Sequence, residues 1–218
     1  MNIDLFTFGE TMLRLASPGA MRLEQSHQLD ISFGGTESNV AANLARLGKR
    51  AVWFSKLPDN PLGRQCALVM QQHGVDTSTI RWDDRARMGL YFVEYGHAPR
   101  GVRVWYDRDH SAASQMTPDD LPEAAIRSAR RVHLTGITPA LSTGCSATVT
   151  RAFDIAAEAG ARLSFDVNYR AKLWEPETAA RVLAPLCARV DMVFVALRDA
   201  VNLFGASPDV DKALHELQ

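Results

Sequence analysis

The sequence has few cysteines and no long run of a single charge or of apolar residues. Its three cysteines, Cys66, Cys145 and Cys187, lie far apart and form no Cys-x-x-Cys or Cys/His pattern, which argues against disulfides and a structural zinc site. The 24 lysines and arginines are interspersed with 25 aspartates and glutamates, so the formal net charge of −1 favours neither nucleic acid nor an anionic membrane as a partner. No apolar run approaches the ~20 residues that span a bilayer, and the start of the chain does not follow the pattern of a signal peptide. These absences predict a cytoplasmic protein that binds neither nucleic acid nor membrane.

What the sequence does contain is an alternation of short apolar runs and amphipathic segments. The chain has 218 residues, of which 46% are hydrophobic, enough for one domain with a buried core. Strands are predicted at residues 3–9, 29–35, 51–57, 131–136, 161–168 and 191–197. Helices are predicted at residues 40–47, 61–74, 145–160 and 176–190. This order predicts a parallel sheet in an α/β domain.

The first predicted helix follows two glycines in the stretch "SFGGTESNVAANLARLG". Ser38 is its predicted N-cap and Gly48 its C-terminal stop. Val40, Leu44 and Leu47 are spaced at i, i+4 and i+7, which predicts one buried stripe.

The adjacent glycines Gly34 and Gly35 lack Cβ atoms, so the backbone can take a positive φ and let a ligand approach its amides. Asn39, one turn into the helix, can donate and accept hydrogen bonds, which suits sugar hydroxyls. The alternative is a tight strand-to-helix turn that packs closely on a sheet. The stretch is neither GxGxxG nor GxxxxGK[ST], so a phosphate cradle is poorly supported.

Two aromatic segments, at residues 89–95 and 102–108, alternate in polarity and predict a β-hairpin. The strand period puts Val102, Val104, Tyr106 and Arg108 on one face, together with Tyr91 if the register allows. A tyrosine beside an arginine suits a planar carboxylate. The alternative is a solvated arginine beside a half-buried tyrosine. We expect this hairpin to belong to a small β lid, built near residues 11–34 and 86–110, on a single domain that covers residues 1–218.

The segment "FDVNYR" ends a predicted parallel strand, where ligands of open α/β sheets bind. Asn168 and Arg170 therefore emerge near a ligand, whereas the alternative is a structural ion pair between Asp166 and Arg170. The histidines lack metal-ligand spacing, and His133 is predicted to be a core residue. No metal site is predicted.

Several of these segments together resemble the ribokinase-like sugar kinases, and within them the 2-keto-3-deoxygluconate kinases. The resemblance rests on "GGTESNVAANLARLG", "KLPDNPLG", "GLYFVEY", "VRVWYDRDHSAAS", "LTGITPALS" and "DVNYRAKLW". It implies a parallel-sheet α/β core, incomplete in this chain, with a small β-sheet lid. It also implies transfer of the γ-phosphate of ATP, with Mg²⁺, to a sugar acid. Separately, an aromatic hairpin can pair with a second copy of itself across a two-fold axis, so we expect a homo-oligomer formed through the lid.

The resemblance also assigns residues. It implies substrate binding by Gly34, Gly35, Thr36, Glu37, Ser38, Asn39, Tyr91, Tyr106, Arg108 and Arg170. It implies nucleotide binding by Asn168, Tyr169 and Arg170. The catalytic aspartate of the family is expected in a glycine-rich turn beyond Gln218, so the 218 residues alone are expected to have little or no kinase activity.

The chain departs from the family pattern at two places. Pro58 replaces a usual glycine, which is interpreted as a loop variation. Ala196 and Asp199 replace the usual Asn or Ser and Glu of a motif that helps to organise water, metal and phosphate. Two alternatives therefore stay open: a kinase of a neutral sugar such as fructose, and a non-catalytic module that binds a sugar acid or assembles with other subunits.

Overall fold

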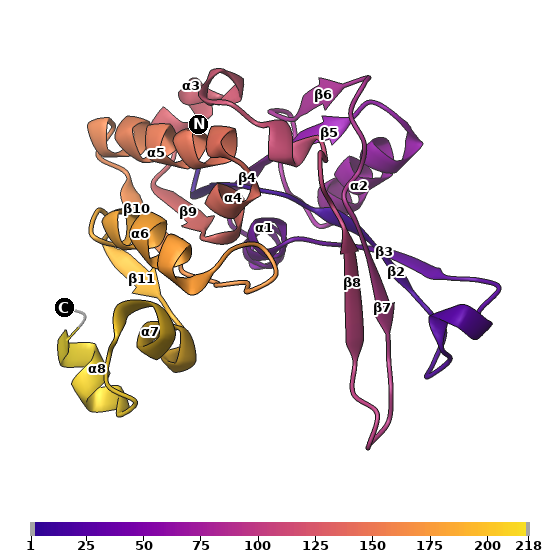
Figure 1. The fold of residues 1–218 in the computed structure, drawn as a ribbon. Helices are drawn as coiled ribbons and strands as arrows, with labels where there is room; N and C mark the ends of the chain where they lie inside the picture. Colours follow the sequence, from indigo (N-terminus) through magenta and orange to yellow (C-terminus); the bar gives the residue numbers. More distant parts are fainter. Residues whose placement is uncertain (1–2, 217–218) are drawn as a thin grey trace.

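The computed structural model describes residues 3–216, which form a parallel five-stranded sheet with helices on both faces and a separate four-stranded sheet (Figure 1). The five-stranded sheet has the order β11-β10-β9-β1-β4, and each neighbouring pair is parallel. Its strands are β1 (Leu5–Phe8), β4 (Ala51–Phe54), β9 (Arg131–Thr135), β10 (Arg162–Asp166) and β11 (Met192–Phe194). The predicted parallel α/β core is confirmed.

The four-stranded sheet, which we call the arm sheet, extends away from this core (Figure 1). Its strands, in spatial order, are β3 (Asp30–Gly34), β2 (Met12–Ala16), β7 (Leu90–Glu94) and β8 (Arg103–Asp107). The β2–β3 and β7–β8 pairs are antiparallel, whereas β2 and β7 are parallel. The predicted hairpin is therefore β7–β8, and a small sheet separate from the core is present as expected.

The predicted strand at residues 51–57 is two strands in different sheets. β4 lies in the core sheet, and β5 (Lys56–Pro58) pairs with β6 (Arg81–Asp83) in a two-stranded sheet. Pro58, interpreted as part of a loop, is the last residue of β5 and pairs with Asp83. The loop interpretation was wrong because the alternation of side chains does not show that the chain leaves the core sheet after Ser55 and forms a strand in another sheet.

Helices cover both faces of the core sheet. The helices within residues 3–216 are α1 (Thr36–Arg46), α2 (Pro61–Gln72), α3 (Glu123–Arg127), α4 (Ile137–Leu141), α5 (Thr143–Glu158), α6 (Pro176–Cys187), α7 (Leu197–Phe204) and α8 (Val210–Glu216), and α8 packs on α7. Short 3-10 turns lie at Leu23–Gln25, Ala113–Gln115 and Pro118–Asp120. None of the helices within residues 3–216 is long and apolar enough to cross a membrane.

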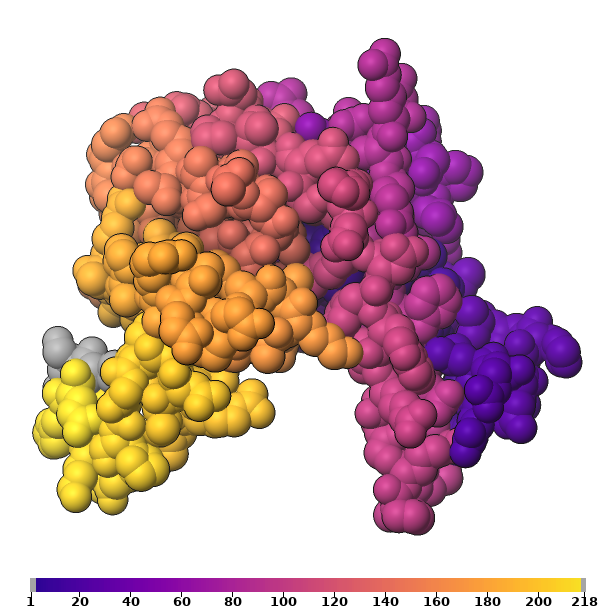
Figure 2. All heavy atoms as spheres, viewed as in Figure 1, coloured from indigo at the N-terminus to yellow at the C-terminus, as the bar shows by residue number. Residues whose placement is uncertain are grey.

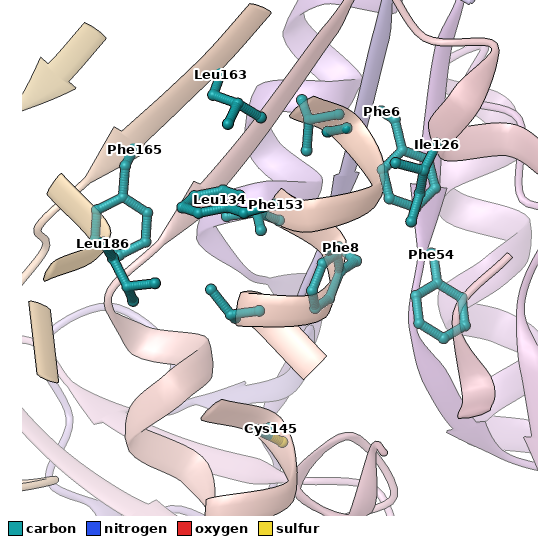
Figure 3. Packing of buried hydrophobic residues seen from close by; sticks show 14 of the residues in the cluster. Phe6, Phe8, Phe54, Ile126, Leu134, Cys145, Phe153, Leu163, Phe165 and Leu186 are labelled. Atoms are coloured by element: carbon teal, nitrogen blue, oxygen red, sulfur yellow. The ribbon is translucent and has the colours of Figure 1, made fainter. Parts of the chain in front are cut away.

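The alternation of side chains along the strands builds two cores. Phe6 and Phe8 of β1 pack with Phe153 of α5 in a cluster that α3, α5 and α6 complete (Figure 3). Leu5 of the same strand belongs to a second cluster that includes Trp53 and residues of α1 and α2. Burial of each large apolar side chain stabilises the fold by about 1.5–3 kcal/mol, and the second cluster holds α1 against the sheet.

Helix α1 begins earlier than predicted. Its N-cap is Gly35, not Ser38, because the chain turns from β3 into the helix directly at the glycines. Ser38 is buried inside the first turn, where its hydroxyl donates to the Gly35 carbonyl at 3.1 Å and accepts from the Thr11 hydroxyl at 2.6 Å. Leu47, predicted to be buried, is 74% exposed, because Ala41 rather than Leu47 is on the helix face that meets the core.

Strand β11 is the outer strand of the core sheet as described. The side chains of Met192, Val193 and Phe194 are all exposed, although a strand in the interior of an α/β sheet normally buries such residues. This edge of the described structure therefore presents an uncovered apolar surface.

Candidate functional site

A cavity of about 860 Å³ lies between the arm sheet, the start of α1 and the loop that follows β10. In Figure 2 this loop, in orange, reaches strand β8, in magenta. Nine of the residues predicted to bind substrate line the cavity: Gly34, Gly35, Thr36, Glu37, Asn39, Tyr91, Tyr106, Arg108 and Arg170. Residues from four separate parts of the chain therefore share one cavity. Ser38, Asn168 and Tyr169 are not part of its lining.

The two glycines are needed for close packing and not for a positive φ. Gly35 has an extended backbone with φ −154°. A Cβ on Gly35 would lie 2.6 Å from the Thr11 hydroxyl oxygen and would also clash with the Glu10 carbonyl. A Cβ on Gly34 would lie 2.5 Å from the phenol oxygen of Tyr91. The tight-turn alternative therefore accounts for Gly35, while Gly34 leaves room for a tyrosine of the cavity wall.

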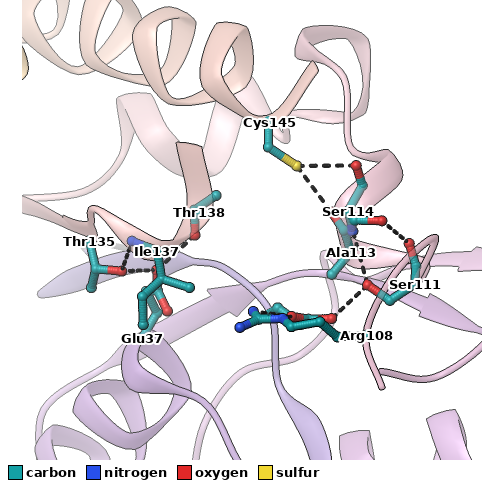
Figure 4. Close-up of polar contacts among 10 residues, drawn as sticks. Glu37, Arg108, Ser111, Ala113, Ser114, Thr135, Ile137, Thr138 and Cys145 are labelled. Carbon is teal, nitrogen blue, oxygen red and sulfur yellow. Dashed lines mark hydrogen bonds and ion pairs between the residues drawn. The ribbon is translucent and has the colours of Figure 1, made fainter. Parts of the chain in front are cut away.

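Glu37 connects α1 to the core at the base of the cavity. Its Oε1 accepts hydrogen bonds from the hydroxyls of Thr135, at 2.7 Å, and Thr138, at 2.8 Å (Figure 4). Burial raises the pKa of Glu37, and the two threonine hydrogen bonds oppose that rise. A Cβ on Gly9 would lie 2.6 Å from each carboxylate oxygen, so Gly9 provides the space for the carboxylate. At least one carboxylate oxygen of Glu37 is thus used to attach α1 to the core.

The tyrosines of the arm sheet face each other as the alternation predicts. Tyr91 and Tyr106 are direct partners in the β7–β8 register, with ring centroids 5.9 Å apart. The Arg108 guanidinium lies 5.8 Å from the Tyr106 ring centroid, a cation–π distance. Val102 is outside the lining and is exposed.

Arg108 is already paired with a carboxylate of the protein. Its Nε donates to Glu10 Oε2 at 2.8 Å and its Nη2 donates to the same oxygen, while the Ser111 hydroxyl donates to Oε1 at 2.6 Å. The ion pair is buried, with side-chain exposures of 9% for Arg108 and 1% for Glu10. No pattern in the sequence links Glu10 to Arg108, because a single carboxylate 98 residues away carries no spacing signal. Only part of the Arg108 donor fork therefore stays available to a ligand.

The loop after β10 is organised by Asp166. Its carboxylate accepts from the backbone N–H of Asn168 at 3.1 Å and from the Asn168 side-chain amide at 3.0 Å, which holds Asn168 at a left-handed φ of 40°. Tyr169 is buried and donates to the Trp174 carbonyl at 3.1 Å. Asn168 and Tyr169 therefore shape the loop and do not line the cavity, and their contact with a nucleotide stays a prediction.

Arg170 does not form the structural ion pair that was the alternative to ligand binding. It forms no salt bridge with Asp166 or with any other of residues 3–216, and it lines the cavity. Burial raises the pKa of Asp166, an effect that the charge of Arg170 reduces and that of Asp199 increases. Arg170 is therefore close enough to be felt electrostatically but is not bound.

Lys172, which the sequence did not single out, completes the wall. Its Nζ donates to the Val104 carbonyl of β8 at 2.8 Å and lies 5.4 Å from the Tyr106 ring centroid. It lines the cavity together with residues such as Glu10, Met12, Asp109, Ile137 and Leu173, which were also missed. Loop lysines follow no periodicity, so nothing but its place in the segment "DVNYRAKLW" could have drawn attention to it.

Two other predictions concern residues outside the cavity. His133 is buried in β9 with Nδ1 2.9 Å from the Ser164 hydroxyl, as expected for a core histidine, and burial lowers its pKa. Asp199, in the altered motif, is buried in α7 and accepts from Arg198 at 3.3 Å. Within residues 3–216, no three His, Cys, Asp or Glu side chains form a group that could hold a metal ion.

The fold and the cavity together define an α/β protein with a cavity between its core and a separate arm sheet. The sequence matches the pfkB family of carbohydrate kinases over residues 2–218, and the chain belongs to this family. It is 42% identical over 217 residues to the 2-dehydro-3-deoxygalactonokinase of Haloferax volcanii, a match that covers 98% of this chain and 68% of that protein. It is 33% identical over 210 residues to the 2-dehydro-3-deoxygluconokinase of Bacillus subtilis, covering 94% of this chain and 64% of that protein.

The fold is likewise similar to a solved structure. The crystal structure of 2-dehydro-3-deoxygluconokinase from Thermotoga maritima superposes with a TM-score of 0.90 at 39% identity, over 94% of this chain and 63% of that one. The chain thus spans about two thirds of the length of these relatives.

Proposed function

We propose that the chain carries the sugar-binding part of an ATP-dependent kinase of a 2-keto-3-deoxy sugar acid, with 2-keto-3-deoxygluconate as the first candidate. The observation that carries this proposal is the single cavity shared by Arg108, Arg170 and the Tyr91–Tyr106 pair. Guanidinium groups suit a carboxylate, and tyrosines offer an apolar ring with a hydroxyl. The names of the similar kinases support the same substrate class. They differ in the epimer, so the proposal covers the class.

In the proposed reaction these residues bind and orient the acid. The donors of Arg170 and the free edge of Arg108 would hold the carboxylate, while Asn39 and the first amides of α1 would bind hydroxyls. The arm sheet would act as a lid that limits access of water to the acceptor hydroxyl.

Bound MgATP would supply the phosphoryl group for transfer to that hydroxyl. The described residues do not fit a protein-held Mg²⁺, because residues 3–216 provide no cluster of metal ligands. No step is therefore assigned to the metal. Nucleotide binding by this loop is proposed through Arg170, with Asn168 and Tyr169 shaping the loop that carries it.

We also propose that the 218 residues by themselves give little or no turnover. The matched region covers 63–68% of the similar kinases, so these have further residues that could supply the catalytic base. Glu10 and Glu37, two carboxylates of the cavity, are already hydrogen-bonded to protein groups. The uncovered side chains of β11 offer a surface on which such further residues would pack.

Isothermal titration of the chain with 2-keto-3-deoxygluconate, with its galactonate epimer and with 3-deoxyfructose tests the substrate class. 3-Deoxyfructose has a hydroxymethyl group in place of the carboxylate. We expect at least one acid to bind about tenfold or more tightly than this neutral ketose, a difference of about 1.4 kcal/mol. Equal affinities would favour a neutral sugar. A coupled assay of ADP formation should give only background turnover, and robust turnover would contradict the proposed inactivity alone.

The partner of the arm sheet is proposed to be a second copy of the chain. An apolar row crosses all four strands through the register partners Ile31, Leu15, Phe92 and Trp105. These residues alternate with Tyr91 and Tyr106, so the row lies on the face opposite the tyrosines, and Trp105 also borders the cavity. Ile31 is 55% and Trp105 is 44% exposed. Light scattering should find a dimer that Ile31→Lys dissociates, whereas Leu68→Lys, at an exposed leucine of α2, should leave it intact. A monomeric wild type would refute this partner.

A further inference from the structure

The positive charges of the cavity are not equivalent. Arg108 is balanced by Glu10 in a buried ion pair, so it contributes hydrogen-bond geometry and little net charge. Arg170 and Lys172 form no ion pair with any carboxylate among residues 3–216. The uncompensated positive charge of the cavity wall therefore comes from the loop after β10.

A third carboxylate of the lining, Asp109, does not offset this charge from close by. It is exposed and forms no ion pair with Arg170 or Lys172 among residues 3–216; the pKa of Arg87, outside the lining, is raised mainly by its hydrogen bond to Asp107, and the charge of Asp109 adds to that rise. Glu37 is held by its two threonine hydrogen bonds below the start of α1. Neither acid forms an ion pair with Lys172.

The ammonium group of Lys172 lies where this loop meets strand β8 of the arm sheet. The 2.8 Å hydrogen bond to the Val104 carbonyl uses one N–H of an ammonium group that has three, and a carbonyl does not neutralise its charge. Val104 and Tyr106 both line the cavity, and the ammonium lies 5.4 Å from the Tyr106 ring centroid. The remaining donors are thus at the rim of the same cavity as Arg170.

We propose that Lys172 is a specificity-determining residue that selects an anionic sugar. Together with Arg170 it supplies the attraction for the carboxylate, while Arg108, fixed by Glu10, sets its orientation. The inference rests on the proposed function, because it assumes that the ligand is a sugar acid. Loss of the Lys172 charge then weakens binding of the acid and leaves binding of the neutral analogue nearly unchanged.

The test is isothermal titration of wild type, Lys172→Met and Lys172→Arg with 2-keto-3-deoxygluconate and with 3-deoxyfructose. Methionine keeps the length and apolar stem of the side chain, and arginine keeps the charge. Lys49→Met, at an exposed lysine outside the cavity, is the matched control. We expect Lys172→Met to raise the Kd of the acid about tenfold and that of 3-deoxyfructose less than twofold. Lys172→Arg should stay within about threefold, and Lys49→Met should equal wild type.

Every other outcome contradicts either the inference about Lys172 or the proposed function. If wild type prefers the acid and Lys172→Met keeps the same ratio of affinities, the inference is wrong and the proposed function stands. If Lys172→Met weakens both ligands equally, Lys172 only fastens the arm sheet and does not determine specificity. If wild type binds both ligands equally or neither of them, the proposed function fails and the inference fails with it.

Discussion

The buried pair of Glu10 and Arg108 is the contact whose removal should change this protein most clearly. Glu10→Gln and Arg108→Met each remove one charge and leave the other in a site where the side chains are only 1% and 9% exposed. Removal of one partner of a buried pair costs about 3–5 kcal/mol, because the remaining charge stays without a counter-charge. We therefore expect each single variant to lose about 3 kcal/mol of its free energy of unfolding, or about 6–12 °C in Tm for a chain of this size.

The double variant Glu10→Gln/Arg108→Met separates this interaction from simple loss of packing. It leaves no unpaired charge, so its loss should be much smaller than the sum of the two single losses. Urea unfolding of the four proteins gives the coupling free energy, which we expect to be about 1.5–3 kcal/mol.

Asp107→Asn is the matched control for this cycle. It removes one charge of a neighbouring ion pair in which Arg87 is 41% and Asp107 is 53% exposed. This change should alter the free energy of unfolding by less than about 1 kcal/mol. Strictly additive losses in the Glu10/Arg108 cycle, or single losses no larger than that of the control, would refute the reasoning.

Two further predictions concern residues around α1. Gly35→Ala would place a Cβ 2.6 Å from the Thr11 hydroxyl oxygen and against the Glu10 backbone, so urea unfolding should reveal a loss of about 1–3 kcal/mol in the free energy of unfolding. Gly101→Ala, with no atom within 4 Å of its Cβ, should be neutral. Equal effects at the two positions would contradict the close packing at Gly35. Because burial raises the pKa of Glu37, the native state holds this proton more tightly than the unfolded state, so the free energy of unfolding falls as pH rises from about 4.5 through the raised pKa. Glu37→Gln has no titratable group at this position, so its free energy of unfolding should not show this fall between pH 5 and 8. Parallel pH dependences of the variant and the wild type would rule out the raised pKa.

The sequence by itself determined the main elements of the core sheet and the class. The alternation of apolar runs and amphipathic segments was sufficient for the parallel sheet, because buried strands and helices each impose a local period on the chain. The strand period also predicted that Tyr106 and Arg108 share a face, and the β7–β8 register adds Tyr91 to it. The family followed from motifs that are contiguous in the sequence, and the match over residues 2–218 confirms it.

The tertiary structure alone decided how the polar side chains of the site are used. Glu10 meets Arg108 across 98 positions, and Lys172 meets Val104 across 68, and no local pattern records such distances. The same holds for Ser38, Asn168 and Tyr169, whose residue types suit a ligand but whose hydrogen bonds lie within the protein. A local period reports which face a side chain occupies, whereas its partner depends on how distant elements pack. The division of charge between a compensated Arg108 and an uncompensated Arg170 and Lys172 therefore belongs to the fold and not to the motifs.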